Sequence, residues 1–386
     1  MGTRRQLDAW GEPGARRQLD KVRRLVVKVG SGLVSAPGPG ADPARIAALA
    51  AEIAAVRQGR EIALVTSGAI MAGTARLALA ERPRSIPEKQ AAAAVGQSAL
   101  MRQYEIAFAP HGITVGQVLL TAYDIGDRTR YLNARNTLLT LLRFGVLPIV
   151  NENDTVAVEE IKVGDNDNLS ALVASLIDAD LLVLLTDVDG LYTDDPSVSA
   201  AARKLDTVES VTDEIARLVW DRAGRVSVGG MATKLEAAQK AAASGIPMVI
   251  ANGGASGVLR RLLAGESVGT YFAPKADRLT ARKRWIAFAV PPQGRLTVDA
   301  GALRALTQQG RSLLPSGVVD VEGDFAAGEV VAVVSQTDGK EVGRGLVNFD
   351  ATELRKIRGV KTREIEVRLG YRSVDEVIHR DNLVIL

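Results

Sequence analysis

LVVKVGSG, at residues 25–32, is a run of aliphatic and β-branched residues that ends in two glycines around a serine. The run predicts a strand buried on both faces, because apolar side chains occupy successive rather than alternate positions. The glycines predict a tight turn after the strand. Lys28 interrupts the apolar run and needs an anionic partner, since an unpaired buried charge is very costly. This stretch therefore indicates a parallel sheet with a charged side chain near a strand end.

The same arrangement repeats along the chain. Residues 43–58 form an alanine-rich helical pattern, and EIALVTSGAI at residues 61–70 again leads from an apolar strand into a turn of small residues. Further apolar runs lie at residues 112–120, 146–150, 181–186 and 247–251. Short apolar strands alternating with helices predict an α/β fold, a three-layer αβα sandwich with a mainly parallel central sheet. In such sheets the ligand lies at the carboxyl ends of the strands.

The pattern changes near residue 275, where a charged connector, KADRLTARKRWIAF, leads to a proline pair. Short predicted strands with frequent turns follow, at residues 317–321, 329–334 and 342–349. They predict a small β-barrel-like domain of under about 100 residues. We expect the α/β domain at residues 21–274, a linker at 275–292, and the β domain with a C-terminal tail at 293–386.

The first 20 residues contain the string RRQLD twice, around a segment with glycine and proline. We interpret residues 1–20 as a disordered extension without function, because unanchored termini are commonly poorly ordered. A misplaced start codon would explain the repeat equally well.

The composition excludes several kinds of chemistry. The chain has no cysteine, which removes disulfides and thiolate catalysis, and its two histidines, His111 and His379, are expected to be structural or exposed. With 47% apolar and 24% charged residues there is material for a large core. The apolar runs are far shorter than the roughly 18 residues that a membrane span needs, and no signal peptide is recognisable. We expect a cytoplasmic protein without membrane contact that works with carboxylates, lysines and backbone amides.

Polar and glycine residues gather where the predicted strands end. The clusters are Lys28 with residues 30–32, residues 66–68, residues 151–154, residues 164–168, Thr186 with Asp187, and VGGMATK at residues 228–234. The last one opens a predicted helix, whose free amides favour an anion. Lys28 and Lys234 together are suited to hold a phosphoryl group during its transfer.

Each cluster also has a plainer interpretation. The loop at residues 30–32 is neither a Walker A motif nor GxGxxG, and alone it is an ordinary strand-to-helix turn. In GDNDN, at residues 164–168, Asp167 or Asn168 could simply cap the following helix. The functional interpretation places these side chains toward a ligand from the start of that helix.

Seven motifs together carry a resemblance to a known family. In chain order they are KVGSG, TSGAI, NENDT, GDNDNLSALVA, TDVDGLY, GGMATK and RKRWI. This series resembles the glutamate 5-kinases of the amino acid kinase family, from about residue 22 to the C-terminus. The C-terminal part resembles the PUA domain that many bacterial members carry.

The resemblance implies roles for individual residues. Lys28, Asp167 and Lys234 would be catalytic, with Asp167 orienting the two lysines. Ser67, Asp154 and Asn166 would bind glutamate. The ATP site would consist of Lys28, Gly30, Thr186, Asp187, Val228, Gly229, Gly230, Met231, Ala232, Thr233 and Lys234. No metal ligand is assigned.

The implied reaction is the ATP- and Mg²⁺-dependent phosphorylation of the L-glutamate side-chain carboxylate to L-glutamyl 5-phosphate, the first step of proline biosynthesis. That carboxylate, with a pKa near 4.3, is ionised at neutral pH and needs no general base. The implied partners are proline as feedback inhibitor, a glutamyl phosphate reductase downstream, and further copies of the chain in a dimer or tetramer. Residues 121–135 are the candidate for a mobile loop that senses proline, or else an ordinary surface loop or helix.

Two other functions fit parts of the sequence. One is an amino acid kinase of different substrate specificity. The other is RNA binding by the C-terminal domain, because the chain from residue 278 onward holds 17 Lys and Arg against 14 Asp and Glu. The basic residues there include Arg355, Lys356, Arg358, Lys361 and Arg363. A solvated basic face explains them better than an RNA site does.

Overall fold

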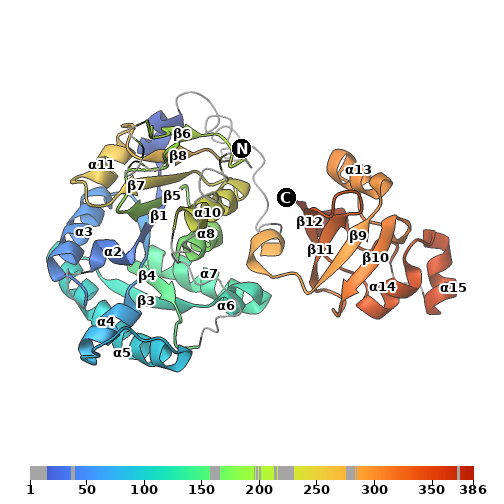
Figure 1. Cartoon of the computed structure of the whole chain (residues 1–386), viewed down its shortest axis with the longest axis horizontal. Coiled ribbons are helices and arrows are strands. Elements are labelled where there is room, and N and C mark those ends of the chain that lie inside the picture. The colour runs from blue at the N-terminus through green and yellow to red at the C-terminus, as the bar shows by residue number, and fades with distance from the viewer. Residues whose placement is uncertain are drawn as a thin grey trace. The chain divides into compact units, whose positions relative to one another are not determined.

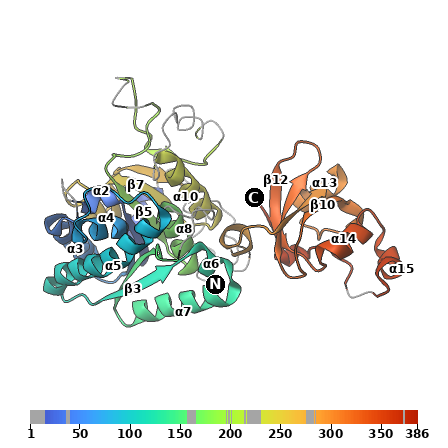
Figure 2. The same ribbon diagram turned by 60° about the horizontal axis from the view of Figure 1, so that its bottom comes forward.

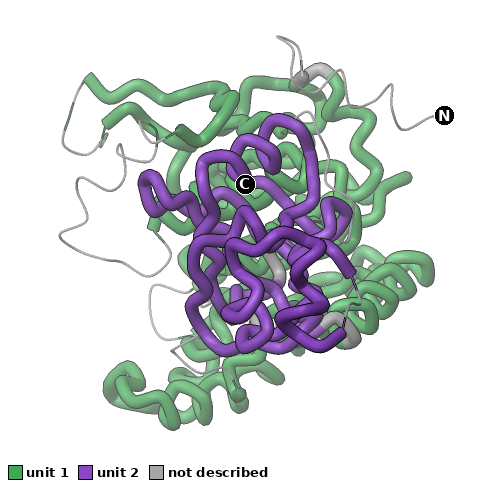
Figure 3. Tube along the Cα trace, turned by 90° about the vertical axis from the view of Figure 1, so that its right-hand side faces the viewer, with its two compact units in different colours: residues 1–125, 129–278 green, residues 126–128, 279–386 purple. Residues whose placement is uncertain are grey.

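The computed structural model describes residues 15–35, 40–156, 166–194, 196, 199, 201–212, 215, 230–274, 283, 285–371 and 374–386. The chain divides into two compact units (Figure 3). Unit 1 comprises residues 1–125 and 129–278, and unit 2 comprises residues 126–128 and 279–386. None of the helices in the described ranges is long and apolar enough to cross a membrane.

Unit 1 is built on an eight-stranded sheet with the order β3-β4-β2-β1-β5-β7-β8-β6 (Figure 1). The strands are β1 (Arg24–Val29), β2 (Glu61–Val65), β3 (Val115–Leu120), β4 (Leu147–Glu152), β5 (Leu181–Thr186), β6 (Thr207–Val208), β7 (Met248–Asn252) and β8 (Thr270–Phe272). The first six strands in this order are parallel, and β8 runs antiparallel to β7. The predicted mainly parallel α/β sheet is confirmed, and the two short edge strands were not predicted.

Helices cover both faces of this sheet (Figures 1 and 2). One face carries α2 (Ser31–Val34), α3 (Pro43–Val56), α4 (Ala69–Arg76), α5 (Ile86–Phe108) and α11 (Val258–Leu263). The other carries α8 (Asn166–Leu176), α10 (Met231–Ala243) and α7 (Arg128–Arg143). Arg135 of α7 forms an ion pair of 2.6 Å with Asp178, which lies two residues after the end of α8. The result is the three-layer sandwich expected from the sequence.

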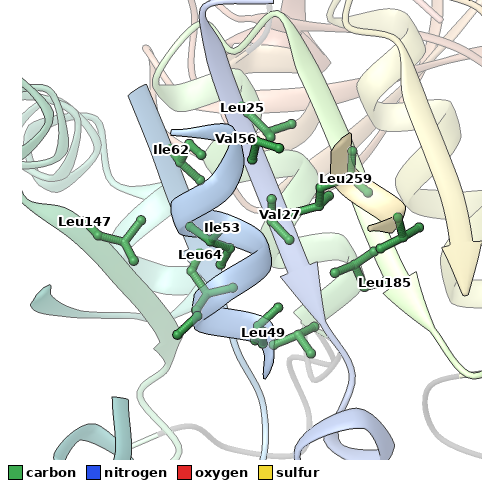
Figure 4. Packing of buried hydrophobic residues seen from close by; sticks show 14 of the residues in the cluster. Leu25, Val27, Leu49, Ile53, Val56, Ile62, Leu64, Leu147, Leu185 and Leu259 are labelled. Carbon is green, nitrogen blue, oxygen red and sulfur yellow. The ribbon is translucent and has the colours of Figure 1, made fainter. Parts of the chain in front are cut away.

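Strand β1 separates the apolar core from the charged site. Leu25 and Val27 are fully buried and pack toward α3, whose Ile53 contributes to the same cluster (Figure 4). Successive side chains of a strand point to opposite faces. Lys28 therefore points to the face covered by α8 and α10, and the alternation within one strand places its ammonium group there.

Helices α4 and α5 cross with their backbones in contact. A Cβ atom on Gly73 would lie 1.7 Å from the carbonyl oxygen of Ala92, and one on Gly96 would lie 1.8 Å from that of Ala69. No side chain fits at either position, so only glycine permits this approach. Since only the N-cap Gly68 separates Ser67 from α4, the crossing fixes the turn that carries this serine against α5.

The prediction of a disordered extension at residues 1–20 is wrong for its last residues, whereas residues 1–14 lie outside the described ranges. Ala15–Lys21 form a 3₁₀ helix in which Leu19 is fully buried. The Arg16 guanidinium donates to the carbonyl oxygens of Val268, at 2.9 Å, and Gly269, at 3.2 Å. These partners are about 250 residues away in sequence, and so no local pattern could reveal them.

The segment at residues 121–135 is largely helical and not a loop. It contains α6 (Ala122–Gly126) and the start of α7. The carboxylate of Asp124 accepts hydrogen bonds from the backbone N–H and hydroxyl of Thr121, at 2.9 and 2.6 Å, and pairs with Arg130 at 2.8 Å. These contacts cap the start of the helix and favour it. The segment therefore has the structure of an ordinary helix, which was one of the alternatives to a mobile loop.

Unit 2 has a separate five-stranded sheet with the order β10-β9-β11-β12-β13. The strands are β9 (Gly294–Val298), β10 (Val318–Gly323), β11 (Val330–Ser335), β12 (Glu341–Leu346) and β13 (Leu383–Ile385); the helices include α13 (Ala300–Gln309), α14 (Ala351–Ile357) and α15 (Ile365–Leu369). All neighbouring pairs are antiparallel except β9 with β11. The small C-terminal β domain is confirmed. Trp285 and Ile286, within the predicted linker, are buried.

Candidate active site

Three charged side chains meet inside unit 1, beneath the carboxyl end of β1. Lys28 Nζ lies 2.5 Å from Asp167 Oδ1, and Lys234 Nζ lies 3.1 Å from Asp167 Oδ2. Asp167 has no exposed surface, and the lysines are 6% and 7% exposed. The hydroxyl of Thr233 donates to Asp167 Oδ2 at 3.1 Å. The three residues predicted to be catalytic therefore form one buried, interlocked cluster.

The cluster has an excess of positive charge. Burial, the largest influence, would raise the pKa of Asp167, but the two ammonium groups and their hydrogen bonds outweigh it and hold that pKa below its ordinary value. Asp167 is thus an anion at neutral pH, and the ionised triad carries a net charge of about +1. An anion placed beside the two lysines would balance this charge.

The starts of two helices bring these groups together. Asp167 lies in the first turn of α8, and Lys234 lies in the first turn of α10. Unpaired N–H groups and the partial positive charge of a helix N-terminus favour anions. Met231, Ala232 and Thr233 form the start of α10 after Gly230, whereas Val228 and Gly229 fall outside the described residues.

A chain of carboxamide hydrogen bonds connects the ends of β2 and β4 to α8. Asn166 Nδ2 donates to Ser67 Oγ at 2.7 Å and to Asn151 Oδ1 at 3.1 Å. Asn151 Nδ2 in turn donates to Gln97 Oε1 of α5 at 2.8 Å. Ser67 and Asn166, both predicted to bind substrate, are therefore in direct contact. Asn166 also lies next to Asp167 in sequence, so this chain of hydrogen bonds extends to the cluster of Lys28, Asp167 and Lys234.

Asp154 lines a cavity of about 290 Å³ next to this chain of hydrogen bonds, which Gln97 shares. The cavity is lined by Ala93, Ala94, Gln97, Ser98, Gln117, Leu119, Glu152, Asn153, Asp154 and Thr155. Burial raises the pKa of Asp154 to about 6. A cationic group in the cavity would favour the ionised form of Asp154, so this carboxylate is suited to hold an ammonium group.

The remaining predicted residues lie at the ends of neighbouring strands. The backbone N–H of Gly30 donates to Leu185 O of β5 at 3.3 Å, and a Cβ atom there would lie 4.0 Å from Lys28 Nζ. Thr186 ends β5, and its hydroxyl donates to Asp187 at 3.0 Å. A second cavity of about 290 Å³ borders the ends of β5 and β7, with Asp189 and Asn252 among its lining residues.

Comparison with known proteins fits this geometry. Residues 23–252 match the amino acid kinase family, and residues 294–369 match the PUA domain. The chain belongs to the amino acid kinase family. It is 51% identical over 376 residues to a glutamate 5-kinase of Moorella thermoacetica, covering 97% of this chain and 99% of the relative. It is 52% identical over 369 residues to a glutamate 5-kinase of Geobacter metallireducens, covering 95% and 99%.

Within this amino acid kinase, the structure adds Glu236, Lys240 and Gln97, which the motifs did not indicate. Asn168 Nδ2 donates to Glu236 Oε2 at 3.1 Å, and Lys240 Nζ donates to Asn168 Oδ1 at 2.6 Å. These two hydrogen bonds connect α8 to α10 next to the charged cluster. Gln97 joins the carboxamide chain from the middle of α5. Its only signal in the sequence is a polar residue within an alanine-rich helix, which does not distinguish a site from a solvated face.

Proposed function

We propose that this chain transfers the γ-phosphoryl group of ATP to the side-chain carboxylate of L-glutamate, giving L-glutamyl 5-phosphate and ADP as the first step of proline biosynthesis. The observation that carries the proposal is the buried cluster of Lys28, Asp167 and Lys234 next to a chain of carboxamides. The near full-length similarity to glutamate 5-kinases supports the choice of substrate.

In this mechanism the lysines neutralise two anions that must approach each other. A carboxylate oxygen attacks the γ-phosphorus, the bond to the β,γ-bridging oxygen breaks, and ADP leaves with that electron pair. The attacking carboxylate is already ionised, so no residue has to remove a proton. Lys28 and Lys234 would stabilise the charge on the transferring group, and Asp167 would hold both ammonium groups in place.

The two substrates would occupy different parts of the strand ends. Ser67, Asp154 and Asn166 would bind glutamate, with the Asp154 carboxylate facing its ammonium group. Gly30, Thr186, Asp187 and the residues from Val228 to Lys234 would surround the nucleotide, whose phosphates would lie at the start of α10.

Magnesium would accompany the nucleotide and neutralise its phosphates. Within the described ranges there is no group of three or more His, Cys, Asp or Glu that could hold a metal. This donor set fits an ion held mainly by phosphate oxygens and water, with one or two carboxylates such as that of Asp187.

The experiment is ATP turnover with a panel of carboxylic acids, in which the acyl phosphate is trapped with hydroxylamine. We expect hydroxamate formation with L-glutamate at a kcat/KM at least about tenfold above that with L-aspartate or N-acetyl-L-glutamate. Preference for another acid of the panel would establish a different specificity within the family. No phosphorylation of any acid would refute the proposal.

We further propose inhibition by L-proline, which shares the ammonium and carboxylate groups of glutamate and would compete for the same residues. A reductase that consumes the reactive acyl phosphate is the expected partner, and assembly into a dimer or tetramer is expected. An increase in the apparent KM for glutamate with added proline, at unchanged kcat, is the predicted result. Proline without effect at about 100 times the glutamate KM would exclude this inhibition.

Contacts within unit 2 account for some of its basic residues without RNA. Arg355 donates to the carbonyl oxygen of Gly323, and Arg358 pairs with Asp320. Two of the five basic side chains considered for RNA are therefore engaged within their own domain.

A further inference from the structure

The side-chain amide of Gln97 uses its oxygen but not its nitrogen for a hydrogen bond to the described residues. The side chain belongs to α5, is 8% exposed and lines the cavity that contains Asp154. Its Oε1 accepts the hydrogen bond from Asn151 Nδ2, whereas its Nε2 has no hydrogen-bond partner among the described residues. A buried N–H group without an acceptor costs free energy, because it has lost its hydrogen bonds to water. Such a donor at the wall of a cavity calls for an acceptor from a ligand.

The direction of the hydrogen bonds determines which end of the amide is free. Asn166 donates to Asn151, and Asn151 donates to Gln97. In this series of three side-chain amides, called the amide relay below, each oxygen that accepts does so from the nitrogen of the preceding amide. The relay starts with Asn166 Oδ1, which likewise has no partner among the described residues, and it ends with Gln97 Nε2. It thus offers a ligand one acceptor at the Asn166 end and one donor at the Gln97 end.

The position of Gln97 is fixed by its neighbour in sequence. Gly96 is the residue at which α5 touches the backbone of α4, so the helix cannot rotate or withdraw without breaking that contact. Gln97 lies at the end of the relay that is remote from Asp167 and the two lysines, where the phosphoryl transfer would occur. A group that contacts Gln97 therefore belongs to the non-reacting end of the substrate.

We propose that Gln97 Nε2 donates a hydrogen bond to the α-carboxylate of the amino acid substrate and makes Gln97 a specificity-determining residue. This inference rests on the proposed function, because it assigns one end of that substrate. The α-carboxylate supplies the missing acceptor, and the neighbouring ammonium group faces Asp154. The side-chain carboxylate is then left to extend along the relay toward Lys28.

The test replaces the donor of the protein by an acceptor and, separately, the acceptor of the substrate by a donor. Gln97→Glu keeps the size of the side chain and leaves an oxygen for Asn151, but it presents a carboxylate to the substrate. The substrates are L-glutamate and L-isoglutamine, in which the α-carboxylate is replaced by a carboxamide. We expect kcat/KM for L-glutamate to fall about 10- to 100-fold, as for a lost hydrogen bond to a charged group. For L-isoglutamine it should stay equal or rise, since the carboxamide can donate to the new carboxylate.

The matched control is Gln103→Glu, which makes the same substitution in the same helix at a residue that is not among those lining the cavity. We expect it to change the ratio of the two kcat/KM values less than about threefold, and the KM for ATP to stay the same in both variants. Equal losses for both substrates in Gln97→Glu would show a merely structural role and overturn the inference, as would an equal effect of Gln103→Glu. Wild-type protein that phosphorylates neither substrate would instead refute the proposed function.

Discussion

Lys28 and Lys234 contact opposite oxygens of a single carboxylate, that of Asp167, at 2.5 and 3.1 Å. The carboxylate separates two ammonium groups that would otherwise repel each other in a buried position. It also determines their spacing, since each lysine is held on its own side of a rigid planar group. A phosphoryl group between them would meet two donors whose positions are set before it arrives.

Lys234→Ala should lower kcat by about 10²- to 10³-fold, the usual effect of removing one donor to a developing charge. Asp167 keeps its ion pair with Lys28, so the far-UV circular dichroism spectrum should stay unchanged. The matched control is Lys240→Ala in the same helix, which removes a contact to Asn168 and not to Asp167. A Lys234→Ala protein with nearly wild-type kcat would remove this lysine from the mechanism.

Asp167→Asn should destabilise the protein by about 3–5 kcal/mol, because it leaves two buried ammonium groups without their counter-charge. The measurement is chemical denaturation at pH 7. Asp178→Asn serves as the comparison, since its ion pair with Arg135 is partly exposed and is expected to contribute at most about 1 kcal/mol. Similar losses in both variants would contradict the buried triad.

The same carboxylate predicts how stability depends on pH. The pKa of Asp167 in the folded protein is lower than its value of about 3.9 in the unfolded chain. Its contribution to stability is therefore complete above about pH 3.9 and is lost as the pH falls through the lowered pKa. Denaturation curves measured from pH 7 down to about pH 2 should show a steeper loss of stability for the wild type than for Asp167→Asn once the pH falls below about 3.9. Parallel curves would argue against this coupling.

Glutamate use should decline at acidic pH because of Asp154. With its pKa raised to about 6, the carboxylate is ionised at pH 7 and becomes protonated below about pH 6, and it then loses its attraction for an ammonium group. We expect kcat/KM for glutamate to fall about tenfold per pH unit below pH 6, while the KM for ATP changes little. Asp154→Asn should have a low kcat/KM that no longer varies over this range. An unchanged profile in that variant would assign the titration to another group.

Gly96→Ala should unfold or strongly destabilise unit 1, because the added methyl group would lie 1.8 Å from the carbonyl oxygen of Ala69. Overpacking of this kind costs about 3 kcal/mol or more, which corresponds to a decrease in Tm of about 6 °C or more. Gly32→Ala is the control, since nothing lies within 4 Å of the position its Cβ would take. Equal Tm values for the two variants would show that the helices can separate at no cost.

The order of strands and helices in unit 1 was predictable, because strands buried on both faces give continuous apolar runs that end in glycine or polar residues. The position of Lys28 within such a run also predicted an anionic partner. The identity of that partner, Asp167, came from family resemblance, since the contact joins residues that are far apart in sequence. The contacts of Leu19, Arg16 and Gln97 were not predictable, because they depend on tertiary neighbours and leave no periodic pattern.

The three charged residues come from β1 and from two helices that follow much later in the chain. Asp167 lies 139 positions after Lys28, and Lys234 lies a further 67 positions after Asp167. Forming the triad requires closing long loops, which is slow and entropically costly during folding. On the ribosome, Lys28 emerges long before its partner Asp167 and must stay solvated until α8 has been synthesised, and the triad is complete only once α10 has followed. Phosphoryl transfer should therefore be among the last properties that a newly made chain acquires.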